Sequence, residues 1–189
     1  MPANPAIDAK LELASASDAS TICTLRMAAA KGLTDQFGIG TWSFVAESEA
    51  GVRTDMIAAN VFVVRSHGEL VATLKLGTRK PWLGEIGFFT PCARPIYLTA
   101  MAVAAREQRS GIGRRCLEQA RAEAARLNAD IIRLDTYDGP AGAADFYRKC
   151  GFREVRRAEY NGTPLVWFEA AVTVVASGQP GVPVATTSR

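Results

Sequence analysis

The sequence has a single histidine, His67, and four cysteines that lie far apart, with no C-x-x-C pair among its 189 residues. Protein metal sites are built mainly from clustered histidine, cysteine and carboxylate ligands, so this composition argues against a metal centre. Scattered cysteines in a chain of this length are typical of free thiols in a reducing compartment. The sequence also lacks a signal peptide and any apolar run near the roughly 18 residues that a membrane-spanning helix requires. We therefore expect a cytoplasmic protein that binds no metal and no membrane.

Neither charge is in strong excess: 22 Lys and Arg residues against 19 Asp and Glu residues give a net charge of +3. The positive residues gather near one turn and do not form a stripe, which argues against bulk nucleic-acid binding. The hydrophobic share of 48% and the charged share of 22% are those of an ordinary globular domain. We expect one domain over residues 1–175 and a flexible tail over residues 176–189, where Ser, Gly, Pro, Thr and Val prevail.

The spacing of apolar residues changes along the chain between the period of a strand and that of a helix. Strands are predicted at residues 8–14, 60–65, 69–76, 96–104, 129–136, 152–157 and 164–174, with a loose-ended further strand within 79–95. Helices are predicted at residues 19–30, which Gly32 would end, and at 47–59, 112–127 and 141–150. In the helix 112–127, spacings of three and four residues predict one buried face, made of Ile112, Cys116, Leu117, Ala120, Ala124 and Leu127.

A glycine-containing turn, Gln108-Arg109-Ser110-Gly111-Ile112-Gly113, joins the apolar strand at residues 96–104 to the following helix. The first backbone N–H groups of a helix have no partner within it, and the helix dipole is positive at that end. Gly111 and Gly113 carry no side chain that would keep a phosphate from the backbone, and Arg106, Arg109, Arg114 and Arg115 surround the turn. The turn therefore predicts a polyphosphate site.

Two blocks of this sequence resemble the GNAT superfamily of acyl-CoA-dependent N-acetyltransferases. The first is Met101-Ala102-Val103 followed by the glycine turn, which is similar to the acyl-CoA motif of that family. The second is the strand Ile131-Ile132-Arg133-Leu134-Asp135, a break, and Phe146-Tyr147-Arg148-Lys149-Cys150-Gly151-Phe152. The resemblance extends from about residue 96 to residue 169. It implies a GNAT fold of the α/β (α+β) class, with a mixed six- to seven-stranded sheet, about four flanking helices, and strands 96–104 and 129–136 splayed apart.

The resemblance also implies that acetyl-CoA is the co-substrate. Backbone N–H groups of the glycine turn would hold the coenzyme A pyrophosphate, and the pantetheine arm would pair with the edge of the preceding strand. The Val103 N–H, or a neighbouring N–H, would polarise the thioester carbonyl. The implied coenzyme site consists of Met101, Ala102, Val103, Gln108, Arg109, Ser110, Gly111, Ile112, Gly113 and Arg114.

The amine acceptor would attack the thioester directly, so two proton transfers are left for the protein. Tyr147 matches the tyrosine that lies near the thioester sulfur in the family, which makes it the candidate general acid; the alternative is that it only packs beside Phe146. Many relatives carry a glutamate on the strand before the glycine turn, and this strand has no carboxylate. Glu85 is the substitute general base, with Asp135 or a water chain as alternatives. Relatives often carry an asparagine in the break, where this chain has Asp138-Gly139-Pro140.

The acceptor pocket is predicted from four aromatic residues, Phe37, Trp42, Trp82 and Phe88. They favour a small, partly apolar primary amine over a protein tail. Residues 33–44 either form a substrate-gating loop or pack their aromatic side chains on the core. A GNAT-fold module that binds acyl-CoA without catalysing transfer is the alternative to an enzyme, and acylation of charged tRNA is a minor one. Dimers are common in the family, so a homodimer that uses the last strand is a further expectation.

Overall fold

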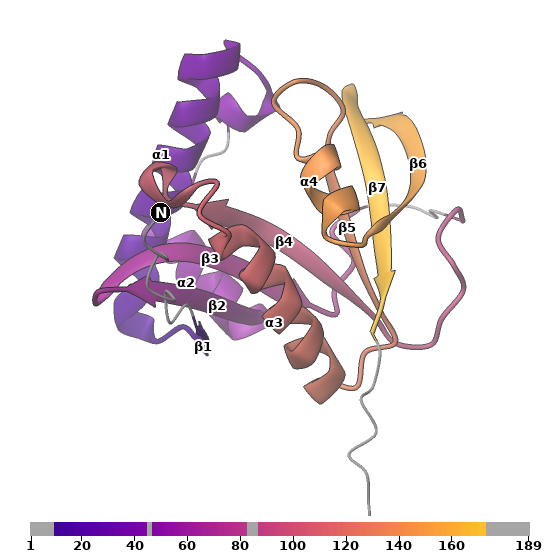
Figure 1. The fold of residues 1–189 in the computed structure, drawn as a ribbon, viewed down its shortest axis with the longest axis horizontal. Helices are drawn as coiled ribbons and strands as arrows, with labels where there is room; N and C mark the ends of the chain where they lie inside the picture. The colour runs from indigo at the N-terminus through magenta and orange to yellow at the C-terminus, as the bar shows by residue number, and fades with distance from the viewer. Residues whose placement is uncertain (1–9, 45–46, 83–86, 173–189) are drawn as a thin grey trace, which may run out of the picture.

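The computed structural model describes residues 10–44, 47–82 and 87–172. Its centre is a seven-stranded sheet in the order β1-β2-β3-β4-β5-β7-β6, seen nearly from its face in Figure 1. The strands are β1 (Leu11–Leu13), β2 (Asn60–Ser66), β3 (Glu69–Gly77), β4 (Pro95–Val103), β5 (Ile131–Tyr137), β6 (Arg153–Tyr160) and β7 (Thr163–Ala171). The helices are α1 (Ala19–Phe37), α2 (Glu49–Ala58), α3 (Ile112–Arg126) and α4 (Ala144–Lys149), with short 3-10 turns η1 (Ala16–Asp18), η2 (Thr41–Phe44) and η3 (Ala105–Glu107). The predicted GNAT-type sheet of six to seven strands with about four helices is confirmed.

The sheet opens between β4 and β5. These two strands are parallel and pair only at Pro95 with Ile131, Ile96 with Ile132 and Tyr97 with Arg133. Every other neighbouring pair in the sheet is antiparallel. Beyond Tyr97 the two strands diverge, as Figure 1 shows. The predicted splay is therefore present, and it leaves one edge of β4 without a strand partner over the second half of its length.

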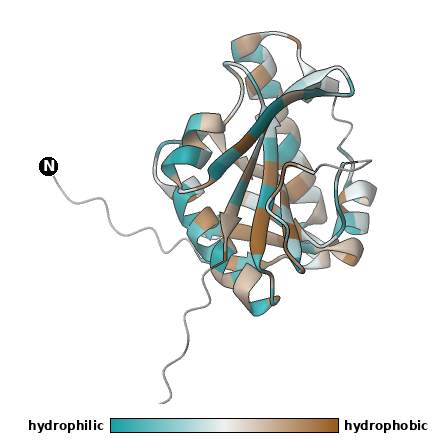
Figure 2. Cartoon of the chain, turned by 90° about the vertical axis from the view of Figure 1, so that its right-hand side faces the viewer, coloured by the Kyte–Doolittle hydropathy of each residue, from teal (hydrophilic) through white to brown (hydrophobic). Residues whose placement is uncertain are grey.

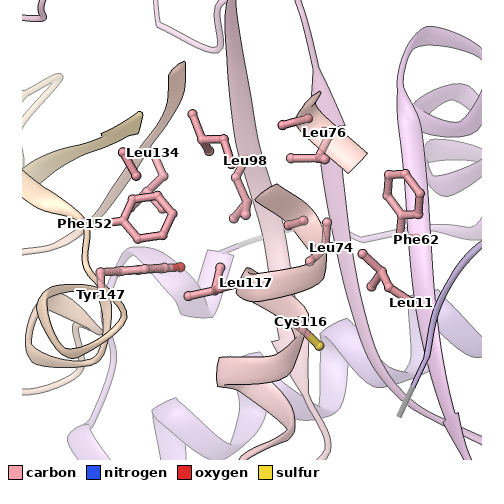
Figure 3. Packing of buried hydrophobic residues seen from close by; sticks show 14 of the residues in the cluster. Leu11, Phe62, Leu74, Leu76, Leu98, Cys116, Leu117, Leu134, Tyr147 and Phe152 are labelled. Carbon is pink, nitrogen blue, oxygen red and sulfur yellow. The ribbon is translucent and has the colours of Figure 1, made fainter. Parts of the chain in front are cut away.

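Helices α3 and α4 cover one face of the sheet, which we call the α3 face. The main core lies here: Phe62, Leu74, Leu98, Leu134 and Phe168 from successive strands pack with α3 residues and with Tyr147 of α4. Figure 3 shows this packing around Leu117. Five of the six α3 residues predicted to be buried are buried, namely Ile112, Cys116, Leu117, Ala120 and Ala124. The sixth, Leu127, is 42% exposed because the helix ends at Arg126 and the chain turns away there.

Helices α1 and α2 cover the opposite face, which we call the α1 face. Side chains alternate between the two faces along a strand. Val61 and Val63 of β2 therefore pack on α1 and α2, while their neighbour Phe62 belongs to the α3 face. On the β5-β7-β6 side, a cluster of buried aromatic residues covers the α1 face: Trp82, Phe89, Tyr97 and Trp167, with Phe88 against them. Figure 2 shows stretches of hydrophobic residues along strands in the middle of the fold.

The structure corrects two of the predicted elements. Helix α1 runs through Gly32 to Phe37 and ends at Gly38, whose φ of 83° and N–H bond to the Thr34 carbonyl close the helix. The loop predicted for residues 33–44 is thus largely helical. The described residues of 79–95 form no strand before Pro95, because three prolines and two glycines interrupt the segment. The hairpin predicted at Asn161-Gly162 is present, with positive φ at both residues.

Within the described residues, no helix is long and apolar enough to cross a membrane. Residues 173–189, which include the predicted tail, lie outside the described part of the chain.

Replacement of Leu117 by alanine is expected to cost about 2–5 kcal/mol of the free energy of unfolding, because it leaves a cavity in the main core. Leu127→Ala, on the same helix but 42% exposed, should change stability by about 0.5 kcal/mol or less. Urea denaturation of both variants measures the difference. Equal losses would contradict the described packing of α3.

Candidate active site

The turn between β4 and α3 is built around two residues with positive φ, Arg109 at 64° and Gly111 at 94°. Gly111 is the N-cap of α3 in the left-handed region, which glycine adopts without strain. The backbone N–H groups of Gly111, Gly113 and Arg114 make no hydrogen bond to any described residue. They lie at the positive end of a 15-residue helix. This arrangement suits a bound anion.

Two side chains of the turn bind its own backbone. Gln108 Nε2 donates to the Val103 carbonyl at 3.3 Å, and Ser110 Oγ donates to the Glu107 carbonyl at 2.6 Å. Both residues were predicted to contact coenzyme. In the structure their side-chain hydrogen bonds stabilise the conformation of the turn. The Arg106 guanidinium forms an ion pair with the Glu69 carboxylate.

The free edge of β4 supplies hydrogen-bonding groups next to this turn. Ala104 N–H donates to the Val71 carbonyl on β3 at 2.8 Å. Backbone N–H groups alternate in direction along a strand, so the Val103 and Met101 N–H groups point to the opposite edge. Between Thr73 and Lys75 the β3 register shifts, and Ala100 takes a φ of 51°. This β-bulge turns the second half of β4 away from β5.

A cleft of about 690 Å³ runs through the sheet at the splay. On the α3 face it is lined by the glycine turn and by α4, and on the α1 face by α1. Eight of the ten predicted coenzyme residues line it: Met101, Ala102, Val103, Gln108, Arg109, Gly111, Gly113 and Arg114. Ser110 and Ile112 do not; Ile112 is 1% exposed and packs in the core. The remaining lining residues are Ala28, Ala29, Gly32, Leu33, Gln36, Ala105, Glu107, Ala141, Ala143, Phe146, Tyr147 and Lys149.

Three exposed cations, Arg109, Arg114 and Lys149, line the cleft and form no ion pair with any described residue. Sequence reasoning missed Lys149, although it lies in the second resembling block two residues after Tyr147. The α1 residues Ala28, Ala29, Gly32, Leu33 and Gln36 were missed as well, because only the tertiary packing brings this helix to the glycine turn. Gly113 needs its small size: a Cβ there would lie 3.2 Å from the Phe146 ring.

Tyr147 lies on α4, lines the cleft and is 7% exposed. Its ring packs on Phe146 and Phe152 at centroid distances of 5.3 and 5.7 Å, and Figure 3 shows it beside Leu117 and Phe152. Burial raises the pKa of the Tyr147 hydroxyl well above its ordinary value, and the Asp135 carboxylate raises it further. Tyr147 therefore keeps its proton at neutral pH, as a proton donor must.

Asp135 lies on β5 just beyond the last pair with β4, and its side chain is on the α1 face, since Leu134 before it packs on the α3 face. Trp82 Nε1 donates to Asp135 Oδ1 at 3.1 Å. Burial raises the pKa of the Asp135 carboxyl, although the bond from Trp82 opposes this rise. Glu85, the first-choice base from the sequence, lies outside the described residues.

The four aromatic residues predicted for the acceptor pocket are separated in the structure, and none of them lines the cleft. Phe37 ends α1 and is 39% exposed. Trp42, in η2, contacts Tyr137 at the end of β5 with ring centroids 5.1 Å apart. Trp82 and Phe88 both pack on Phe89 in the aromatic cluster of the α1 face. Only Trp82 comes close to a polar group of the site, through Asp135.

Replacement of Gly111 by alanine should strain the turn, because an L residue at a φ of 94° costs on the order of 1–3 kcal/mol. We expect the Kd for coenzyme A to rise about 5- to 30-fold as the N–H groups lose their alignment. Gly162→Ala is the matched control: its φ is 77° and it lies in the β6–β7 hairpin. It should lose similar stability and leave the Kd unchanged, as measured by calorimetry. Unchanged affinity in Gly111→Ala would contradict the anion site.

No group of three or more His, Cys, Asp or Glu residues within the described ranges is placed to hold a metal. Comparison with solved structures finds the same fold in many acetyltransferases. Ribosomal-protein-alanine N-acetyltransferase from Brucella melitensis is 17% identical with a TM-score of 0.63, over 86% of this chain and 99% of that chain. The yncA protein of Salmonella typhimurium, solved with its cofactor acetyl-CoA, is 16% identical with a TM-score of 0.63, over 89% and 96% of the chains.

Aminoglycoside 6'-acetyltransferase type Ii is 16% identical with a TM-score of 0.64, over 87% of this chain and 98% of that one. Among curated proteins, no sequence match was found. The family model described as "Acetyltransferase (GNAT) domain" matches residues 58–154, from the end of α2 through the glycine turn and α4 into β6. With the splayed sheet, the glycine turn and this match in agreement, the chain belongs to the GNAT family of acetyltransferases.

Proposed function

We propose that this enzyme transfers the acetyl group of acetyl-CoA directly to the primary amine of a small molecule. The observation that carries the proposal is the cleft that crosses the sheet, lined by the glycine turn and α4 on one face and by α1 on the other. Two reactants can meet in the splay from opposite faces, and a protein nucleophile is not needed.

The coenzyme would bind on the α3 face. The N–H groups of Gly111, Gly113 and Arg114 have no partner in the described part of the chain and would hold the pyrophosphate, with Arg109 and Lys149 beside it. The free edge of β4 would pair with the amides of the pantetheine arm. Acetyl-CoA supplies an acetyl group activated as a thioester. The residues present fit this donor, because the cleft combines cations and N–H groups that have no partner among the described residues with apolar side chains such as Phe146.

Three groups of the chain would then share the chemistry. The Val103 N–H, directed at the splay, would stabilise negative charge on the carbonyl oxygen. Asp135 on the α1 face would accept a proton from the acceptor ammonium, which leaves a neutral amine for attack on the carbonyl carbon. Tyr147 on the α3 face would donate its proton to the departing sulfur as the tetrahedral intermediate collapses. The nitrogen loses its second proton to solvent as the amide forms, and Tyr147 is reprotonated from solvent. The raised pKa of Asp135 makes it a stronger proton acceptor, and the raised pKa of Tyr147 keeps its hydroxyl protonated before the transfer.

A small acceptor fits the α1 face better than a polypeptide. Helix α1 lines the cleft on this face, the Trp42–Tyr137 contact lies at the end of β5, and Trp82 of the aromatic cluster lies beside Asp135. The four cysteines are free thiols, which supports our expectation of a reducing, cytoplasmic setting.

Thiol release from acetyl-CoA, measured over a panel of amines, tests the proposal. The panel contains small primary amines and a peptide with an N-terminal alanine, since two structural neighbours are ribosomal-protein-alanine N-acetyltransferases. We expect turnover with one or more small amines and none with the peptide. Turnover with the peptide alone would overturn the small-molecule assignment.

A further inference from the structure

Helix α1 lines the cleft with one face of its C-terminal half. The lining residues follow the i, i+1, i+4, i+5, i+8 spacing of a single helix face and extend for about 12 Å along the axis. We call this face the α1 wall; its residues are Ala28, Ala29, Gly32, Leu33 and Gln36. Three of them are exposed and two are half-buried, so the wall is accessible from the open cleft.

The α1 wall carries no charge. Four of its residues are apolar, and the fifth, Gln36, is neutral. The charged residues that line the cleft lie in residues 107–114 and on α4, and Glu107 is the single carboxylate among the described lining residues. An ammonium group against the α1 wall would lose its hydration without gaining a partner. The wall therefore suits an apolar group and not the reacting nitrogen of the acceptor.

Gly32 leaves open space in the middle of the α1 wall. A Cβ at this position would lie more than 4 Å from every described atom beyond its own helical turn. Gly32 lies inside α1 and does not have a positive φ, so neither packing nor backbone conformation requires a glycine there. A glycine inside a helix destabilises it relative to alanine. The position thus loses helix stability and leaves room in the cleft.

The proposed donor site sets the direction in which an acyl chain would extend. The glycine turn would hold the pyrophosphate on the α3 face, with Tyr147 of α4 at the thioester sulfur and the Val103 N–H at the carbonyl oxygen. Carbon atoms beyond the carbonyl would continue through the splay, away from the glycine turn, to the α1 wall on the other side of the cleft. Met101 and Phe146, which also line the cleft, add apolar surface along this path.

We propose that the α1 wall is an acyl-chain site, and that the enzyme transfers longer acyl groups, such as butanoyl and hexanoyl, as well as acetyl. This rests on the proposed function and extends its donor to acyl-CoA of medium chain length. The bonds change as in acetyl transfer: the amine nitrogen bonds to the carbonyl carbon, and the C–S bond breaks. Of the two protons that the ammonium group gives up, one is balanced by the proton gained by the sulfur, and the other is released to solvent.

Binding of coenzyme A thioesters tests the acyl-chain site without an acceptor. The probes are acetyl-, butanoyl- and hexanoyl-CoA, measured by calorimetry. We expect the Kd to fall with chain length and to be about tenfold lower for hexanoyl-CoA than for acetyl-CoA, because each added CH₂ group moves from water to the apolar wall. Gly32→Leu fills the open space and should remove this gain, so that the three thioesters bind with similar Kd.

Lys31→Leu is the matched control. Lys31 precedes Gly32, is not among the residues that line the cleft, and has a side chain that is 74% exposed. The variant adds the same side chain to the same helical turn outside the cleft, so it should keep the dependence of Kd on chain length. Gly32→Leu should unfold at the same Tm or a higher one, because leucine is a better helix former than glycine. A lost gain in affinity is then not explained by a damaged fold.

Turnover gives the second readout. With an amine that the wild type acetylates, we expect N-butanoyl and N-hexanoyl products in mass spectrometry, at kcat/KM values similar to that of acetyl transfer. Gly32→Leu should lower the ratio of kcat/KM for hexanoyl-CoA to that for acetyl-CoA by about tenfold or more, because specificity follows the fit of the chain in its pocket. Lys31→Leu should leave this ratio unchanged.

The same Kd for all three thioesters in the wild type, or a dependence on chain length that persists in Gly32→Leu, would overturn this inference while acetyl transfer stands. A wild-type enzyme that acetylates an amine and forms no butanoyl or hexanoyl product would overturn it as well. Absence of turnover with every thioester would instead overturn the proposed function, and the Kd values would then decide on the acyl-chain site alone.

Discussion

Replacement of Tyr147 by phenylalanine is expected to lower kcat by roughly 10²- to 10⁴-fold, the usual contribution of a positioned general acid. The ring would keep its packing on Phe146 and Phe152, so the fold and the coenzyme site should survive. Steady-state kinetics with acetyl-CoA and a small amine measures the loss, and calorimetry should find the same Kd for coenzyme A. Unchanged turnover would mean that Tyr147 only packs in the core.

The pKa of Tyr147 adds a second check. Burial raises the pKa of its hydroxyl above the ordinary value of about 10. Deprotonation of Tyr147 should therefore not lower the wild-type kcat at any pH below about 10. Phe152→Leu is a matched control, because it disturbs the packing beside Tyr147 and leaves the hydroxyl in place. It should lower stability much more than it lowers kcat.

Replacement of Asp135 by asparagine should lower kcat/KM by roughly 10²- to 10⁴-fold at neutral pH, because the variant cannot accept a proton. Its amide oxygen can still accept from Trp82 Nε1, which keeps the local geometry. The wild-type kcat/KM should fall as the pH is lowered, with an apparent pKa above that of an ordinary aspartate. In Asp135→Asn this fall at acid pH should be absent. Tyr147 is an ionisable group whose charge state is coupled to this carboxylate.

Stability separates a catalytic Asp135 from a structural one. A carboxyl whose pKa is raised in the folded state stabilises the fold while it is protonated, and this contribution is lost as the pH rises through the folded-state pKa. At neutral pH the ionised Asp135 therefore costs stability, and Asp135→Asn should unfold at the same Tm or a higher one. The difference should shrink at acid pH. A large fall in Tm together with full activity would show that Asp135 is structural and that the base lies elsewhere.

The parts of the fold that follow from local sequence were predictable. The glycine turn, the buried face of α3 and the Asn161-Gly162 hairpin each depend on residues close together in the chain. The end of α1 was predicted wrongly, because a glycine inside a helix costs only about 1 kcal/mol and the true stop, Gly38, lies six residues farther on. The described residues of the segment before β4 also differ from the prediction. Apolar residues between prolines look like a strand, and Trp82, Phe88 and Phe89 instead pack as a cluster.

The donor half of the site could be predicted because a contiguous motif makes it. The acceptor half could not, because long-range contacts assemble it. Trp82 reaches Asp135 across 53 residues of sequence. Trp42, in the η2 turn that follows α1, meets Tyr137 at the end of β5, far away in the sequence. Four aromatic residues in two segments suggested one pocket, and the structure instead distributes them among a helix end, a contact across the splay and a buried cluster.

The central claim is direct acetyl transfer within the splay, and isotope labelling tests it most directly. The enzyme is incubated with acetyl-CoA labelled in the acetyl group, first alone and then with a small primary amine that it accepts. Intact-mass measurement of the protein should find no labelled acetyl-enzyme before the amine is added. After addition, the label should appear in the N-acetylated amine in equal amount to the coenzyme A released. A labelled acetyl-enzyme that forms first and passes its label to the amine would contradict the account.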